Sequence, residues 1–279
     1  IRDPLWNTIH LDATAVRIVD TPEFQRLRYI RQLGLAHLVY PGATHTRFDH
    51  ALGVYHLTSV ALRHLRDRGG VAPEAWEGEE LVPYAGLLHD IGHYAFSHAL
   101  EELEAEHVPV HHEEVSQRFF ASPTLRDALA PLGLSAPDRI HEIISGESGL
   151  PLRGLVSGSL DLDKMEYLRR DARFCGVPYG EVDVDRLLQG LVILADPDTG
   201  RKEVGVQEKA ISALESARND SVSALASLDT LYVQRSNDVA DGQAAGGVQD
   251  IDAARSAALA LVDQQNDRID ALKARLPQP

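Results

Sequence analysis

The sequence predicts a mainly helical protein, and two observations lead to this fold class. Most of residues 1–215 carry Leu, Ala, Arg and Glu at helical spacing, with few of the alternating β-branched residues that mark strands. Residues that favour helix starts and helix ends bracket several of these stretches. One exception lies near residues 192–206, where two short apolar runs flank a turn sequence and predict a small β-hairpin.

The first helix that can be placed begins at Thr21 and Pro22, an N-cap residue followed by a proline that suits the first helical turn. Apolar residues then follow on one face until Gly34, where we expect the helix to end. Asp49 is expected to cap the next helix, which runs to the glycine pair at 69–70.

The composition changes after residue 215, which divides the chain into two predicted regions. Aromatic residues nearly vanish there, and Ala, Asp, Gln and Ser dominate. Residues 1–215 are therefore expected to form the main domain, and residues 216–279 a C-terminal helical region. A glycine-containing stretch at about 238–249 predicts a linker within the second region.

Charge and cysteine content exclude several classes of function. Lys and Arg number 27 against 42 Asp and Glu, which gives a net charge of −15 and argues against sequence-independent binding to duplex DNA. The single cysteine, Cys175, cannot form an internal disulfide and favours a reducing cytoplasm. Apolar runs such as 191–195 are too short to cross a bilayer, so no membrane partner is expected.

Histidines are concentrated in one part of the chain. Six of the 13 lie between positions 89 and 112, where proportional scatter would give about one. His89 and Asp90 end an almost wholly apolar segment, and an adjacent His-Asp pair can bind one divalent metal from a single helix end. These ligands suit Mn²⁺, Fe²⁺, Co²⁺, Ni²⁺ or Zn²⁺, and the absence of cysteine ligands argues against a closed structural zinc site. An isolated pair is more often simply hydrogen-bonded, but the histidine density favours metal binding.

Residues 24–48 form a cationic segment within an acidic chain. The segment contains four arginines and no acidic residue: Arg26, Arg28, Arg31 and Arg47. Such a charge run is either a solvated helix face or a binding surface for an anion. The sequence alone leaves both interpretations open.

Ordered motifs across residues 3–210 resemble those of one known family. They are Asp3-Pro4, the segment 20–28, the segment 41–50 that ends in Arg47-Phe48-Asp49-His50, His89-Asp90-Ile91-Gly92-His93, Phe96-Ser97-His98, His112-Glu113 and the segment 161–167. In these residues the chain resembles the HD-domain metal-dependent phosphohydrolases, and among them the deoxynucleoside triphosphate triphosphohydrolases, which are dGTPase-like enzymes. The resemblance implies the helical HD-domain fold and one divalent metal ion, with Mg²⁺ added to the metals above.

The resemblance also implies roles for particular residues. The family's metal set falls on His50, His89, Asp90 and Asp163. Substrate contacts fall on Arg47 for a phosphate, Gln32 and Asp171 for the sugar 3′-hydroxyl, Leu33 against a ribose 2′-hydroxyl, and Lys164 and Tyr167 along the phosphates and sugar. The histidines around the α-phosphate fall on His93, His98 and His112, with Glu101 orienting one of them. Either His98 or His112 would protonate the departing 5′-oxygen, and the sequence does not choose between them.

The implied reaction is hydrolysis of a deoxynucleoside triphosphate to deoxynucleoside and triphosphate, by attack of water at the α-phosphorus. Two other hypotheses for the function stay open. The protein could be a nucleotide monophosphatase or other phosphoesterase that uses the same metal, or a non-catalytic nucleotide sensor. The resemblance fades after residue 205, where Arg218 is the candidate for a further phosphate-binding arginine. Relatives often assemble, so a homo-oligomer is a further open expectation.

Overall fold

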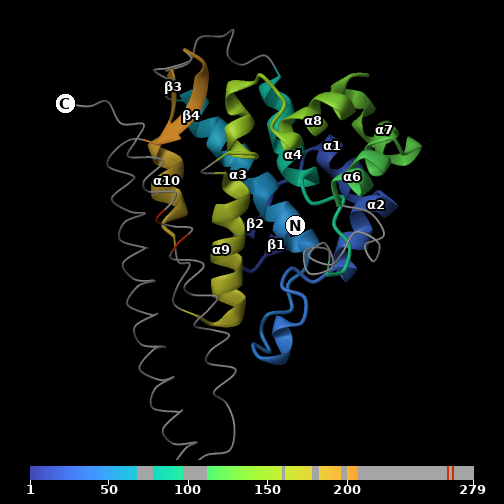
Figure 1. Ribbon diagram of the computed structural model, residues 1–279, viewed down its shortest axis with the longest axis vertical. Helices are drawn as coiled ribbons and strands as arrows, with labels where there is room; N and C mark the ends of the chain where they lie inside the picture. The colour runs from blue at the N-terminus through green and yellow to red at the C-terminus, as the bar shows by residue number, and fades with distance from the viewer. Residues whose placement is uncertain are drawn as a thin grey trace, which may run out of the picture.

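The computed structural model describes residues 1–67, 78–96, 112–158, 161–177, 182–195 and 200–206, together with Asp263 and Asn266. These residues are mostly helical, which confirms the predicted fold class (Figure 1). The α-helices are α1 (Ala13–Val19), α2 (Pro22–Gln25), α3 (Arg47–Asp67), α4 (Val82–Leu88), α6 (His112–Phe120), α7 (Pro123–Leu129), α8 (Ala136–Ser145), α9 (Leu162–Cys175) and α10 (Val184–Gly190). Short 3-10 turns comprise η1 (Arg26–Tyr29), η2 (Ala36–Leu38), η4 (Glu79–Leu81), η6 (Ala130–Leu132) and η7 (Pro151–Leu155).

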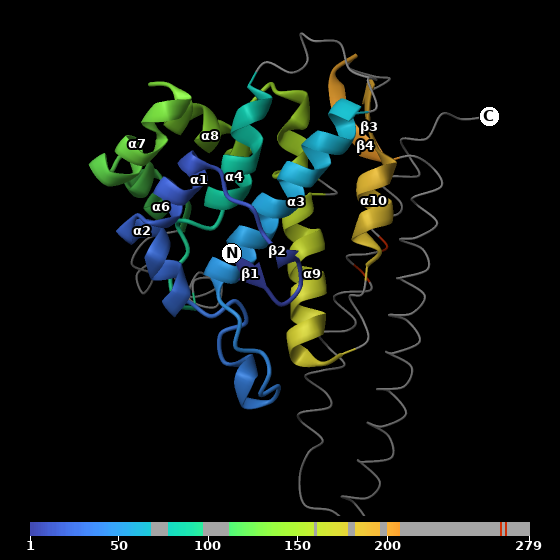
Figure 2. The ribbon, with the colours of Figure 1, turned by 180° about the vertical axis from the view of Figure 1, so that it is seen from behind.

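Helix α3 is the centre of the packing. It contacts α4, α9 and α10, and Figure 2 shows α4 and α9 on either side of it. Its buried residues lie on several faces and include Phe48, Leu52 and Leu57, as expected for a helix surrounded by other helices. No helix in the described ranges has the length and apolar character that a membrane span requires.

The start of α3 corrects one expectation from the sequence. Asp49 does not precede the helix but lies in its first turn, where its Oδ2 accepts hydrogen bonds from the backbone N (2.9 Å) and Oγ1 (2.8 Å) of Thr46. Thr46 precedes the helix, and its Oγ1 lies 3.4 Å from the backbone N of Asp49. The two residues form a reciprocal capping arrangement, and the helix starts at Arg47, two residues before Asp49.

The predicted helix from Thr21 to Gly34 is also shorter than expected. Thr21 caps α2 as predicted, since its side chain accepts from the backbone N of Phe24 at 3.3 Å. The helical turns end at residue 29, because Ile30 adopts an extended conformation and its carbonyl accepts from the backbone N of Arg47 at 2.9 Å. Pairing with the segment before α3 therefore competes successfully with continued helix.

Two hairpins complete the described chain. Strands β3 (Leu191–Ala195) and β4 (Lys202–Val206) pair in antiparallel register, which confirms the hairpin predicted near residues 192–206. Strands β1 (Arg2–Asp3) and β2 (Asn7–Thr8) form a second small antiparallel pair at the N-terminus. The expected domain boundary near residue 215, the linker at 238–249 and Arg218 lie outside the described residues.

Candidate metal centre

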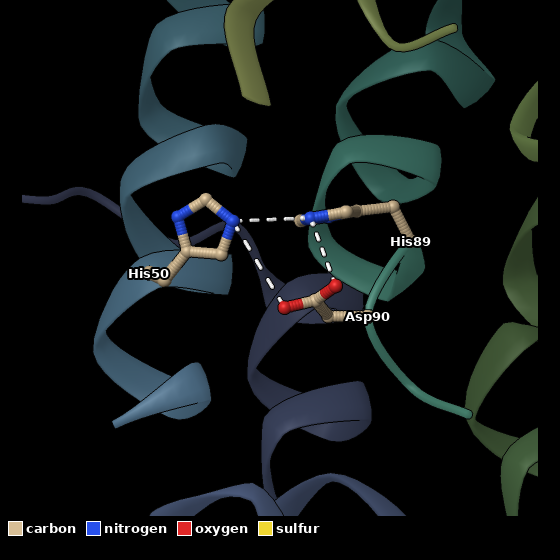
Figure 3. Close-up of side chains that lie close together, drawn as sticks. All are labelled: His50, His89 and Asp90. Carbon is tan, nitrogen blue, oxygen red and sulfur yellow. Dashed lines mark hydrogen bonds and ion pairs between the residues drawn. The ribbon is translucent and has the colours of Figure 1, made fainter. Parts of the chain in front are cut away.

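Three elements bring the predicted metal ligands together. His50 lies in the first turns of α3, His89 and Asp90 directly follow α4, and Asp163 is the second residue of α9. Ligand atoms of His50, His89 and Asp90 all lie within 4.8 Å of one another. Figure 3 shows these three side chains pointing toward one another. Asp163 joins them, because its Oδ1 lies 2.9 Å from His50 Nε2 and 3.4 Å from His89 Nε2.

The hydrogen bonds of the outer ring nitrogens, Nδ1 of His50 and His89, determine whether the inner nitrogens, Nε2, carry a proton or a lone pair. His50 Nδ1 lies 2.6 Å from a carboxylate oxygen of Glu166, and His89 Nδ1 lies 2.8 Å from the carbonyl oxygen of Gly86. These oxygens only accept, so both Nδ1 atoms donate, and in the neutral rings both Nε2 atoms carry lone pairs. The two Nε2 atoms face each other at 3.2 Å beside two carboxylates. Only a proton or a cation between them makes this arrangement favourable, so the donor set fits a divalent metal.

The pKa values of side chains in the cluster reflect the close approach of its imidazoles and carboxylates. Burial alone would lower the pKa of His50, but hydrogen bonds to Asp163 and Glu166 raise it to about 10. Burial alone would raise the pKa of Asp90, but the charges of His89 and Arg47 hold it well below its usual range. The cluster therefore favours ionised carboxylates together with positive charge at its centre.

Glu166 is a site residue to which the sequence assigned no role. It is fully buried on α9 and lies three residues after Asp163, so both side chains face α3. Besides accepting from His50, Glu166 accepts from the Nε1 of Trp6 and the Nε of Arg170, each at 2.8 Å. The position of Glu166 one turn after Asp163 was the signal that could have identified it.

The cationic segment divides into residues with different surroundings. Arg47 is buried, and its Nη1 lies 2.7 Å from Asp90 Oδ2. Arg26 donates to the carbonyl oxygens of Ile91 and His93, which fixes the turn after the His-Asp pair. Burial and the charge of Arg47 lower the pKa of Arg26 to about 10. The interpretation of this segment as a solvated face is therefore wrong for Arg26 and Arg47, which lie at the candidate metal centre.

Two of the predicted catalytic histidines lie beside the cluster of candidate metal ligands. His93 is buried, and its Nε2 lies 3.3 Å from Asp90 Oδ1. The ring of His112, at the start of α6, stacks on that of His93 with centroids 4.1 Å apart and planes 12° apart. His98 and Glu101, the other two predicted catalytic residues, lie outside the described residues.

The predicted sugar contacts meet through a residue that the sequence did not single out. The Nε2 of His45 lies 2.7 Å from Asp171 Oδ1, and the carbonyl of His45 accepts from the backbone N of Gln32 at 3.1 Å. His45 is buried and its ring packs against that of Phe174. It thus joins Gln32 and Asp171, and nothing in its spacing along the chain indicated this position.

The structure also describes the three other residues predicted to contact substrate. Leu33 is half-buried in the segment between η1 and η2. The Nζ of Lys164 pairs with Asp161 and lies 3.2 Å from the carbonyl oxygen of Gly158. The ring of Tyr167 lies 6.5 Å from that of His50, measured between centroids.

Comparison with known proteins identifies the fold. Residues 47–170 match the HD domain family, a range that includes His50, His89, Asp90 and Asp163. An uncharacterized protein of Methanocaldococcus jannaschii is 36% identical over 217 residues, which cover 77% of this chain and 42% of that protein. The crystal structure of a phosphohydrolase from Bacteroides thetaiotaomicron has a TM-score of 0.65 and 34% identity, covering 78% of this chain and 52% of that one.

An enzyme of known activity is also similar. The deoxynucleoside triphosphate triphosphohydrolase SAMHD1 of Xenopus laevis is 34% identical over 214 residues, which cover 63% of this chain and 34% of that enzyme. The chain spans less than half the length of both curated relatives. The protein has an HD-domain fold, and these matches support the HD-domain phosphohydrolases as its family.

Proposed function

We propose that this protein is a metal-dependent hydrolase that converts a deoxynucleoside triphosphate to deoxynucleoside and triphosphate. The observation that carries the proposal is the set of inward-facing ligand atoms, two imidazole nitrogens and two carboxylates, contributed by His50, His89, Asp90 and Asp163. The similarity to SAMHD1 supports the substrate class, and a soluble nucleotide substrate agrees with the cytoplasmic location that we expect.

The four ligands would hold one divalent ion. Such an ion supplies Lewis-acid chemistry, because it polarises a phosphate oxygen and activates a water molecule for attack at phosphorus. Arg47 neutralises Asp90 at 2.7 Å and offers a buried cation beside the site. Its Nε is buried without a hydrogen-bond partner among the described residues, which fits a role in binding a substrate phosphate. Lys164 would hold the trailing phosphates, with Tyr167 beside the sugar.

Proton transfer to the leaving 5′-oxygen is assigned to His112 or His98. His112 stacks on His93, and His93 in turn lies 3.3 Å from Asp90, so the pair extends from the ligand cluster towards α6. Histidine is the side chain that most often transfers a proton in general acid catalysis. Glu101 is proposed to orient one of these rings.

A deoxyribose subsite is proposed around Gln32, Leu33 and Asp171. The Oε1 of Gln32 is buried and has no hydrogen-bond partner within the described ranges, so it can accept from a sugar hydroxyl. Asp171 is held by His45 and is the alternative acceptor for the single proton of the 3′-hydroxyl. Leu33 would oppose a 2′-hydroxyl, because an apolar side chain leaves that hydroxyl without a partner.

The product of the reaction tests the proposal. The protein is incubated with Mn²⁺ and each of the four deoxynucleoside triphosphates, and the products are separated by ion chromatography. We expect deoxynucleoside and intact triphosphate, and no product from the matched Asp163→Ala protein. Orthophosphate as the only phosphate product would favour a phosphatase, and nucleotide binding without any product would favour a sensor. Either result contradicts the proposed reaction.

The sugar subsite has its own test. The ratio of kcat/KM for a deoxyribonucleotide to that for its ribonucleotide is measured in wild type, Leu33→Ala and Leu38→Ala. Leu38 is a nearby leucine that is 72% exposed, so its variant is the matched control. We expect the ratio to fall by about tenfold in Leu33→Ala alone, the scale of one apolar contact. Equal rates on both sugars in the wild type would refute the role given to Leu33.

A further inference from the structure

A buried chain of polar contacts connects the N-terminal hairpin to the candidate metal ligand His50. His50 and Glu166 are almost fully buried, as are Arg170 and Asp3, the next two members. The Nη2 of Arg170 lies 2.6 Å from Glu166 Oε1 and 3.0 Å from Asp3 Oδ2. Buried charges are costly unless they are paired, so each member depends on its neighbours.

The carboxylate of Glu166 is held at both oxygens. Its Oε2 faces His50 Nδ1 at 2.6 Å, whereas its Oε1 accepts from Trp6 Nε1 and Arg170 Nε, each at 2.8 Å. Rotation of the carboxylate would break these contacts together. Glu166 therefore has one orientation, and this orientation directs His50 Nδ1–H outward and Nε2 toward the ligand cluster.

The two candidate imidazole ligands are supported differently. The outer nitrogen of His89 donates to the neutral carbonyl of Gly86, whereas that of His50 donates to a carboxylate. A carboxylate partner makes an imidazole a stronger electron donor than a carbonyl partner does. His50 is therefore the ligand whose strength depends most on its outer partner.

Two local features keep this arrangement in place. Gly53 lies one turn after His50 on α3, and a Cβ there would lie 2.0 Å from Glu166 Oε1, so the absence of a side chain leaves space for the carboxylate. In the N-terminal hairpin, Asp3 Oδ1 accepts from the backbone N of Leu5 and of Trp6, each at 2.8 Å. The turn that positions Trp6 thus also positions Asp3, and Figure 2 shows β1 and β2 next to α3 and α9.

We infer that Glu166, held by Arg170, Asp3 and Trp6, is a positioning residue that sets the divalent-metal affinity of the His50 site. The inference rests on the metal site in the proposed function and deepens it. Glu166 contacts no substrate in this scheme, because it acts through the imidazole of His50. The N-terminal hairpin becomes part of the metal centre, although Trp6 and Glu166 are 160 positions apart in the chain.

Metal affinity without nucleotide tests this inference separately from the reaction. The dissociation constant for Mn²⁺ is measured by titration calorimetry for wild type, Glu166→Gln and Trp6→Phe. We expect about 10- to 100-fold weaker binding in Glu166→Gln, the range typical of lost outer-shell partners. Trp6→Phe keeps an aromatic ring and removes one donor to Glu166, so we expect a weakening of about twofold to fivefold.

The matched control is Glu79→Gln. Glu79 is also a buried carboxylate paired with an arginine, Arg66, but it has no contact with the cluster, so we expect its variant to keep the wild-type affinity. Wild-type affinity in folded Glu166→Gln would overturn the inference, as would equal losses in Glu166→Gln and Glu79→Gln. If Glu166→Gln does not fold, wild-type affinity in Trp6→Phe overturns it. Absence of Mn²⁺ binding to the wild type would instead refute the metal site itself.

Discussion

Replacing Gly92 with alanine tests how closely α6 is held against the turn after the His-Asp pair. A Cβ at position 92 would lie 2.1 Å from the carbonyl oxygen of His112 and 2.8 Å from the backbone N of Ser116. Both atoms belong to backbone, so no side-chain rotation relieves the contact. The φ of Gly92 lies outside the left-handed region, and alanine is therefore penalised by packing alone.

The magnitude follows from these distances. Ordinary separation between non-bonded heavy atoms is about 3.5 Å, so the start of α6 must retreat by about 1 Å. Overpacking of this kind costs about 1–3 kcal/mol of unfolding free energy. The displacement also separates His112 from His93, and a misplacement of about 1 Å in catalytic geometry lowers kcat by about 100-fold.

The assay combines urea unfolding with kcat on a deoxynucleoside triphosphate. Gly149→Ala is the matched control, because no heavy atom lies within 4 Å of its Cβ position and its φ is also outside the left-handed region. We expect the control to behave as wild type in both measurements. A Gly92→Ala protein with unchanged stability and full turnover would refute the reasoning, since α6 would then not need this close contact.

Two further predictions concern metal and pH. Asp163→Ala should lose bound metal and turnover together, whereas His112→Ala should keep its metal and lose turnover by about 100-fold or more; metal analysis with kinetics checks this, and wild-type turnover in His112→Ala would exclude it as the proton donor. Burial, followed by the charge of Asp12, raises the pKa of Tyr55 to about 12. The unfolded tyrosine ionises first, near pH 10, so unfolding free energy should fall between about pH 10 and 12 by up to about 3 kcal/mol. Tyr55→Phe should reduce that fall in urea titrations, and an equal fall in both proteins would contradict the assigned cause.

Sequence patterns within single elements predicted two parts of this structure correctly, the helix end at His89 and Asp90 and the β3–β4 hairpin. The apolar segment ending in His89 and Asp90 fixes both residues at one helix end, and the turn sequence near residue 200 fixes the β3–β4 hairpin. The helix starting at Thr21 was overestimated, because Ile30 bonds to the backbone of Arg47, a partner that helical periodicity does not include.

For the outer partners of the candidate metal ligands, the local signal was limited to the position of Glu166 one turn after Asp163. Glu166 and Arg170 are opposite charges four positions apart, a pattern that most often marks an exposed helix face. Their burial depends on Asp3, Trp6 and Gly53, which belong to other elements and become neighbours only through the tertiary fold. His45 is a similar case, because its contact with Asp171 spans 126 positions.

The origin of the candidate ligands in separate elements has a mechanical consequence. His50 and Asp163 are 113 positions apart, so an ion bound between them would tie α3 to α9 and to the end of α4 as a reversible cross-link. Such a cross-link stabilises the folded chain by mass action, by about 4 kcal/mol when free metal is a thousand times the dissociation constant. The melting temperature would then depend on metal concentration, and chelation would weaken the packing of α3 against α4 and α9.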